Sequence, residues 1–136
     1  MINVFTNGCF DIIHPGHIHL LKTAKSLGNT LTVGINSDWA VKRLKGKNRP
    51  INTDLCRANV LRSIFYIDSV FIFDDVSPMK LIKRLRPNIL VVGDDYSKEQ
   101  IIGKDFVLSY GGEIVRVKKL PEYSTTNIIN KILEGK

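Results

Sequence analysis

Residues 7–21 read NGCFDIIHPGHIHLL, and they connect the apolar segment 3–6 to a segment with the apolar spacing of a helix. Pro15 suits the first turn of a helix, because its fixed φ is helical and its missing N–H loses no partner there. Gly16 allows a ligand to approach the backbone closely. The stretch therefore predicts a strand, a loop and the start of a helix in direct succession.

The same alternation of strand and helix patterns continues along the chain. Short segments rich in β-branched or aromatic residues predict strands at 3–6, 30–36, 69–73, 89–93 and 113–117. Helical patterns predict helices at 16–26, 53–65, 78–85 and 124–133. Alternating units of this kind predict an α/β fold with a mostly parallel sheet of five strands and helices on both faces. A chain of 136 residues is large enough for one such domain, spanning residues 1–136.

The charge balance is basic, with 20 Lys and Arg against 13 Asp and Glu, and it attracts anions. The densest basic stretch, KRLKGKNR at 42–49, has no aromatic residue to stack on bases, and the chain has no helix-turn-helix or RNA-binding signature. A small phosphorylated substrate therefore accounts for the charge without a nucleic-acid partner. A non-enzymatic nucleotide- or RNA-binding module remains the alternative from another class.

Apolar runs and cysteines restrict the setting of the protein. The longest apolar runs, such as 70–73 and 89–92, are too short to cross a bilayer, and the N-terminus lacks a basic segment with a cleavage site. Cys9 and Cys56 lie far apart without metal-ligand spacing. We therefore expect a cytoplasmic protein with reduced thiols, no membrane association and no metal held by protein ligands.

Two histidines flank the Pro-Gly pair, at the edge where a parallel sheet binds its ligands. His14 and His17 are three residues apart, so one helical turn brings both rings to the same side, where both can donate to phosphate oxygens. The positive end of the helix also favours phosphate. Metal ligation by the pair is disfavoured, because no third His or Cys follows at a useful spacing. His19 lies off this face and is interpreted as structural, whereas Asp11 either caps the loop or assists magnesium and substrate.

The segment from Gly8 to His17 resembles the HxGH signature of the cytidylyltransferase-like nucleotidyltransferases, and the resemblance covers nearly the whole chain. Further matching segments follow in order: Asn36–Asp38, Lys42–Gly46, Arg49–Asn52, Arg57, Gly93–Asp94–Asp95–Tyr96 and Ser124–Ile129. The resemblance implies a Rossmann-like nucleotidylyltransferase domain in which a substrate phosphate attacks the α-phosphorus of a nucleoside triphosphate. Pyrophosphate would leave, with Mg²⁺ bound to the triphosphate. Small members of the family pair, so a homodimer is also implied.

Roles carry over from the family to the matching positions of this chain. The catalytic residues that the resemblance implies are His14, His17, Lys45 and Arg57. The nucleotide-binding residues that it implies are Gly8, Cys9, Phe10, Gly16, Gly93, Ser124, Thr125 and Thr126. The substrate-binding residues that it implies are Asp11, Asp38, Lys42 and Asp94.

The resemblance also implies the substrates: the acceptor would be a phosphorylated sugar or polyol, and the nucleotide would be ATP or CTP. The stretches 36–57 and 124–129 are most similar to the heptose 1-phosphate adenylyltransferase branch of the family, which favours heptose 1-phosphate with ATP. Asp94 is typical of the glycerol 3-phosphate cytidylyltransferase branch, but Lys119 stands where that branch has an arginine, and lysine cannot make a bidentate guanidinium contact. A thiol hydrolase built on Cys9 and a histidine would need a thiolate at Cys9.

Overall fold

The computed structural model describes residues 1–94 and 100–135. Five strands form one sheet in the order β3-β2-β1-β4-β5, and each neighbouring pair is parallel. The strands are β1 (Asn3–Gly8), β2 (Thr30–Asn36), β3 (Ser69–Phe73), β4 (Ile89–Gly93) and β5 (Glu113–Val117). The helices are α1 (Pro15–Ser26), α2 (Asp38–Lys45), α3 (Asp54–Arg62), α4 (Met79–Leu85), α5 (Lys104–Ser109) and α6 (Thr125–Glu134). The predicted α/β fold is confirmed.

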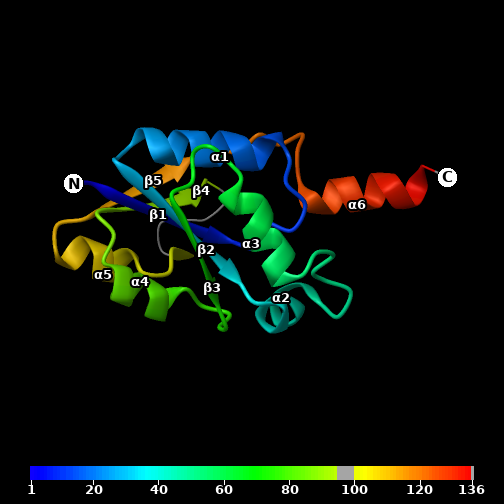
Figure 1. The fold of residues 1–136 in the computed structure, drawn as a ribbon, viewed down its shortest axis with the longest axis horizontal. Helices are drawn as coiled ribbons and strands as arrows, with labels where there is room; N and C mark the ends of the chain where they lie inside the picture. Colours follow the sequence, from blue (N-terminus) through cyan, green and yellow to red (C-terminus); the bar gives the residue numbers. More distant parts are fainter. Residues whose placement is uncertain (95–99, 136) are drawn as a thin grey trace.

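Helices cover both faces of the sheet, with α1 and α3 on one face and α4 and α5 on the other (Figure 1). Side chains alternate between the faces along each strand, so Val4 of β1 packs under α1 while its neighbour Phe5 packs with Leu81 and Ile82 of α4. Strands buried on both sides explain the apolar runs of the sequence. Each fully buried aliphatic or aromatic side chain contributes roughly 1.5–3 kcal/mol, so the two cores hold the strand ends in place.

Most element boundaries agree with the sequence patterns, and the differences have local causes. Strand β1 continues two residues beyond the predicted end, to Gly8. Helix α3 ends at Arg62 because the next amides, from Ser63 and Ile64, bond three residues back in tighter turns. Helices α2 and α5 were not predicted. Helix α2 has eight residues and is rich in charge, and α5 has six residues and no side-chain cap.

The two central strands separate toward their carboxyl ends. Within the described residues, β1 pairs with β4 only through Val4–Ile89 and Phe5–Leu90, whereas it pairs with β2 along its full length. The next residue, Thr6, turns its hydroxyl toward β4 and donates to the Val91 carbonyl at 2.8 Å. This is also where the strand order reverses direction, the position at which open parallel sheets bind ligands.

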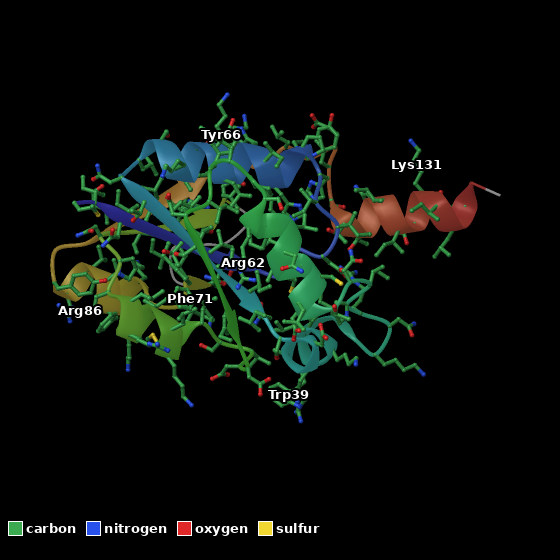
Figure 2. All side chains as sticks on the ribbon, viewed as in Figure 1. Trp39, Arg62, Tyr66, Phe71, Arg86 and Lys131 are labelled. Carbon is green, nitrogen blue, oxygen red and sulfur yellow. The ribbon has the colours of Figure 1, made fainter. Side chains whose placement is uncertain are left out.

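Helix α6 projects from the body of the molecule (Figure 1). None of its residues is buried, although Ile128, Ile129, Ile132 and Leu133 give it an apolar face. The side chain of Lys131 on α6, like that of Trp39 on α2, points away from the two cores (Figure 2). Among residues 1–94 and 100–135, no helix has the length and apolar character that a membrane span requires.

Candidate active site

A cleft of about 360 Å³ opens at the carboxyl ends of the central strands. Its walls come from the loop after β1, the starts of α1 and α6, the ends of β4 and β5, and the loop 46–53. The predicted residues that line it are Gly8, Cys9, Phe10, Asp11, His14, Gly16, His17, Lys45, Gly93, Ser124, Thr125 and Thr126. The volume lies in the range of small-molecule sites.

The two histidines of the opening stretch form the N-terminal cap of α1. His14 is the N-cap residue, and its Nδ1 accepts from the Gly16 amide at 3.1 Å. His17 completes a reciprocal capping box, because its own Nδ1 accepts from the His14 amide at 3.3 Å. A ring nitrogen that accepts carries no proton, so each neutral imidazole has its proton on Nε2. The cap therefore fixes both rings as Nε2–H donors.

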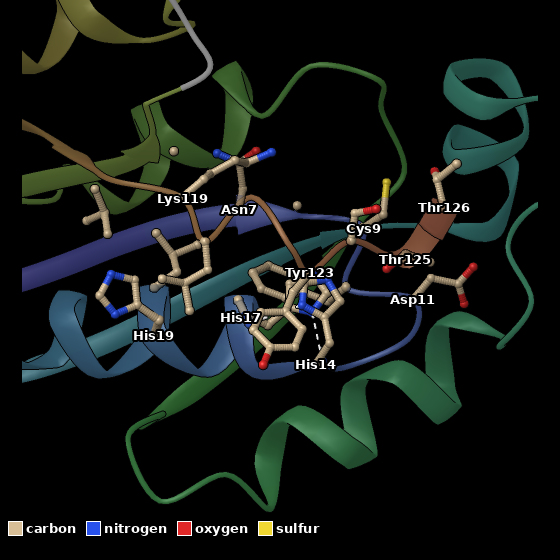
Figure 3. A pocket seen from close by; sticks show the side chains of 18 of the residues that line it. Asn7, Cys9, Asp11, His14, His17, His19, Lys119, Tyr123, Thr125 and Thr126 are labelled. Atoms are coloured by element: carbon tan, nitrogen blue, oxygen red, sulfur yellow. Dashed lines mark hydrogen bonds between the residues drawn. The ribbon is translucent and has the colours of Figure 1, made fainter. Parts of the chain in front are cut away.

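The two rings stack beside each other, with centroids 3.8 Å apart and planes tilted by 30° (Figure 3). Burial lowers the pKa of His17 to about 4, with smaller contributions from the neighbouring His14 and from Lys119. Burial, followed by Lys119, also lowers the pKa of His14 below its usual 6.5. Both imidazoles are therefore neutral at pH 7, and the cap keeps its acceptors.

We expect the protein to lose stability as the pH falls from about 6.5 toward about 4. In that window the unfolded chain binds a proton at His17 that the folded chain does not bind, so protonation favours unfolding. Above pH 6.5 both states are neutral at this position, and this group adds no further change. Urea unfolding of the parent at pH 7 and pH 5 measures the loss, and His17→Asn, which cannot titrate, should lose less. Equal losses in the two proteins would contradict the low pKa.

Two glycines and one left-handed residue make room for the rings. A Cβ on Gly16 would lie 2.9 Å from Cε1 of His14, so only glycine lets the ring fold back over the helix start. A Cβ on Gly8 would lie 3.0 Å from the Phe10 ring, which packs 5.1 Å from the His17 ring. Phe10 itself has φ of 51°, an unfavourable conformation that its burial holds in place. The Gly16 amide is occupied by His14, so this glycine acts through its size.

Helix α6 begins beside the loop after β1. The Ser124 hydroxyl accepts from the Asn127 amide at 2.9 Å and so caps the helix. The Thr125 hydroxyl donates to the Ile12 carbonyl at 3.2 Å, which joins the start of α6 to the loop after β1. Both α1 and α6 thus direct their positive N-terminal ends at one cleft, which favours an anion there.

Asp11 is buried and anchors the loop 46–53. Its carboxylate accepts from the Ile51 amide at 2.7 Å and the Asn52 amide at 2.8 Å. The Asn52 side chain donates back to the Asp11 carbonyl at 2.9 Å. Of the two roles left open by the sequence, these contacts favour the one in which Asp11 holds a loop.

Arg57 does not line the cleft. Arg57 is 1% exposed, and its guanidinium donates to three carbonyls, those of Cys9, Asn36 and Asn52, at 2.8–3.0 Å. The remaining terminal nitrogen donates to the Asp38 carboxylate at 2.9 Å. These contacts join the loops after β1 and β2 to the loop 46–53. In this structure Arg57 and Asp38 therefore form a structural link, and their predicted contacts with phosphate and substrate stay predictions.

Two further predicted residues, Lys42 and Asp94, lie outside the cleft lining. Lys42 is exposed on α2. The Asp94 carboxylate accepts from the Lys119 amide at 3.1 Å, which ties the end of β4 to the segment after β5. Asp95 and Tyr96, the rest of the matching segment, lie outside the described residues.

The cleft also contains residues that sequence reasoning did not assign to catalysis or binding. These are Asn7, Arg49, Lys118, Tyr123 and the apolar Leu20, Val117 and Leu120, together with His19 and Lys119. His19 lies apart from the stacked pair, whereas the Tyr123 ring lies next to His14 with centroids 6.4 Å apart (Figure 3). Two features of the sequence could have indicated these residues: the basic pair 118–119 after a strand, and the aromatic residue directly before Ser124. Lys45, Arg49, Lys118 and Lys119 make the lining strongly basic.

The Cys9 thiol lies in the cleft but is not activated. Burial raises its pKa, and this outweighs the lowering by Lys45, Arg57 and Arg49. The thiol Sγ lies 3.9 Å from the Asn36 side-chain oxygen. Because a nucleophilic cysteine needs a thiolate, the raised pKa counts against a thiol hydrolase.

Comparisons with known proteins give one consistent result. A family model described as cytidylyltransferase-like matches residues 5–131. The bifunctional protein HldE of Geobacter metallireducens is 51% identical over 132 residues, which cover 97% of this chain and 27% of that protein. HldE of Rhodopseudomonas palustris is 48% identical over 131 residues, covering 96% and 27%. The chain therefore spans about a quarter of the length of these curated relatives.

A solved structure is similar over nearly its whole length. It is the crystal structure of the lipopolysaccharide core biosynthesis protein from Thermoplasma volcanium, with a TM-score of 0.75 and 31% sequence identity. The match covers 91% of this chain and 99% of that one.

Proposed function

Because the chain belongs to the cytidylyltransferase-like family of nucleotidyltransferases, we propose that it transfers a nucleoside monophosphate from ATP to heptose 1-phosphate. The observation that carries the transfer chemistry is the pair of neutral imidazoles, each fixed as an Nε2–H donor, inside a basic cleft. The similarity of stretches 36–57 and 124–129 to the heptose branch supports the acceptor and the nucleotide. CTP with glycerol 3-phosphate is the second candidate, on the strength of Asp94.

The proposed reaction is a single displacement at the α-phosphorus. An oxygen of the acceptor phosphate forms a bond to the α-phosphorus, and the bond from that phosphorus to the bridging oxygen breaks. Pyrophosphate leaves with the electron pair. No proton has to be abstracted from the acceptor, because its phosphate is already ionised at pH 7. Such a step needs alignment of the two substrates and positive charge around the reacting phosphoryl group.

The residues of the cleft match those needs. His14 and His17 would donate to non-bridging oxygens of the triphosphate, and the charge on those oxygens grows as the reaction proceeds. Lys45, which also lines the cleft, would neutralise phosphate charge, and the starts of α1 and α6 would add their partial charges. Because the cap already fixes the two imidazole rings, they lose little conformational entropy when the triphosphate binds.

Magnesium would enter with the triphosphate. Among the described residues of the lining, Asp11 is the one carboxylate, and both of its oxygens accept hydrogen bonds. Mg²⁺ keeps several waters and is commonly bound through substrate phosphates, so phosphate oxygens are the ligands that fit here. In that form the ion lowers the negative charge that the cleft has to accommodate. The homodimer that the resemblance implies stays a prediction.

We expect pyrophosphate release when the purified protein is given ATP and heptose 1-phosphate. The experiment tests ATP, CTP, GTP and UTP, each against heptose 1-phosphate, glycerol 3-phosphate and other sugar phosphates. Release with CTP and glycerol 3-phosphate alone would move the assignment to the second candidate. Salt-sensitive RNA binding without release from any pair would overturn the enzymatic proposal.

A matched pair of lysine variants ties the activity to the cleft. Lys45 lines the cleft and Lys47, two residues on, does not, although both are exposed. A hydrogen bond to a charged group contributes roughly 1.5–3 kcal/mol, so Lys45→Ala should lower kcat/KM about 10- to 100-fold. Lys47→Ala should remain close to the parent.

A further inference from the structure

Arg49 lies in the loop 46–53 and reaches the same cleft as the histidines. Its side chain is only 15% exposed, which is unusual for an arginine in a surface loop. Its Nε donates to Oδ2 of Asp11 across 3.4 Å, and that carboxylate is itself 1% exposed. One edge of the guanidinium therefore faces a buried anion.

The backbone around Arg49 is held as firmly as its side chain. The carboxylate of Asp11 also accepts from the amides of Ile51 and Asn52. The Arg49 amide donates to the Gly46 carbonyl at 3.2 Å, which closes the turn after α2. Asp11 thus orients the guanidinium and fixes the loop that carries it.

The two terminal nitrogens of Arg49 have no partner among the described residues. In that part of the chain, no buried side-chain nitrogen or oxygen lacks a hydrogen bond, so these nitrogens are reached by solvent. Because Arg49 lines the cleft, the accessible part of its largely buried side chain opens into the cleft. A fork of parallel N–H donors is left facing the place where the phosphates would bind.

We propose that Arg49 binds a substrate phosphate through its two terminal nitrogens, and that Asp11 is the residue that positions it. The proposal rests on the proposed function, because it names a further contact within the same site. A guanidinium fork matches two oxygens of one phosphate, and the paired carboxylate keeps its plane in one orientation. The phosphate belongs either to the triphosphate or to the acceptor, and the chemistry of recognition is the same for both.

The test replaces Arg49 with lysine, which keeps the charge but removes both the fork and the Nε contact. We expect Arg49→Lys to weaken phosphate binding about tenfold. Calorimetric titration with inorganic tripolyphosphate measures binding at the triphosphate position. The KM for heptose 1-phosphate reports binding at the acceptor position. A weaker tripolyphosphate affinity places the contact on the triphosphate, and a raised acceptor KM alone places it on the acceptor. Arg43→Lys is the matched control, because Arg43 stacks on Trp39 at 4.4 Å and lies outside the cleft lining.

A double-mutant cycle tests the positioning role of Asp11. Asp11→Asn keeps the shape of the side chain but removes the charge that faces Arg49. If Asp11 acts through Arg49, this change should weaken the same binding constant in the parent and have little effect in the Arg49→Lys background. Equal losses in both backgrounds would mean that Asp11 only holds the loop, and would overturn its role in positioning Arg49.

The results separate this inference from the proposed function. If the parent binds tripolyphosphate or turns over and Arg49→Lys matches it in both measurements, the inference is wrong and the function stands. If the parent neither binds tripolyphosphate nor releases pyrophosphate from any pair of substrates, both the proposed function and this inference are wrong.

Discussion

Replacing His17 with asparagine is expected to lower pyrophosphate release about a hundredfold or more while leaving the protein folded. The asparagine oxygen can take the place of Nδ1 and accept from the His14 amide, so the helix cap is kept. The Nε2–H donor is lost, and with it a contact that strengthens as charge develops on the transferring phosphoryl group. Steady-state release with saturating ATP and acceptor measures the loss.

The comparison for this variant is His19→Asn. His19 lies along the same helix, but apart from the stacked pair and outside the cap (Figure 3). The His19→Asn variant should therefore retain most of the parent turnover. A His17→Asn protein that turns over like the parent would remove the histidine pair from the mechanism.

Replacing Arg57 with alanine is expected to destabilise the protein by about 3–5 kcal/mol, the cost of removing one partner from a buried charged network. Three carbonyls, those of Cys9, Asn36 and Asn52, would lose their donor, and an unsatisfied buried polar group costs roughly 1–3 kcal/mol. Urea unfolding followed by circular dichroism measures the change. A loss below about 1 kcal/mol would contradict the role of Arg57 as a structural link.

Arg62→Ala is the matched control, because Arg62 is on the same helix and exposed. It should change stability by about 0.5 kcal/mol or less. If Arg57→Ala does not fold, Arg57→Lys provides the measurement, because lysine keeps one charged donor and should be intermediate. At a temperature where the lysine variant is folded, its KM for ATP should change less than that of Lys45→Ala.

The sheet could be predicted because its strands are buried on both faces and therefore short, apolar and β-branched. Four of the five strands match the predicted bounds. Helix α2 had detectable signals, since Ser37 caps its start and Gly46 ends it at a φ of 103°, but its charged sequence resembled a loop. Helix α5 had no such signal: it begins at Gly103 without a side-chain cap.

The site was predicted in part, and the part that was missed has one cause. His14 and His17 follow from a motif between a strand end and a helix start, whereas Lys45 and the start of α6 were indicated by the resemblance to the family. A sequence does not tell whether a charged side chain is buried, so Arg57 was interpreted as a phosphate ligand and Arg49 received no role. The missing information was which backbone carbonyls and carboxylates these side chains meet after folding.

The histidine cap of α1 has a consequence for how this protein can change over time. Functional residues are commonly a burden on folding, and their replacement often strengthens a protein at the expense of its activity. Here the same Nδ1 atoms that orient the two donors also complete the first turn of α1. A substitution by a residue that cannot accept from the His14 or Gly16 amide forfeits part of the helix cap together with the donor, so such a change does not strengthen the protein at the expense of its activity. Selection for a well-folded chain alone would then disfavour such residues at positions 14 and 17, even through periods when the reaction itself is not needed.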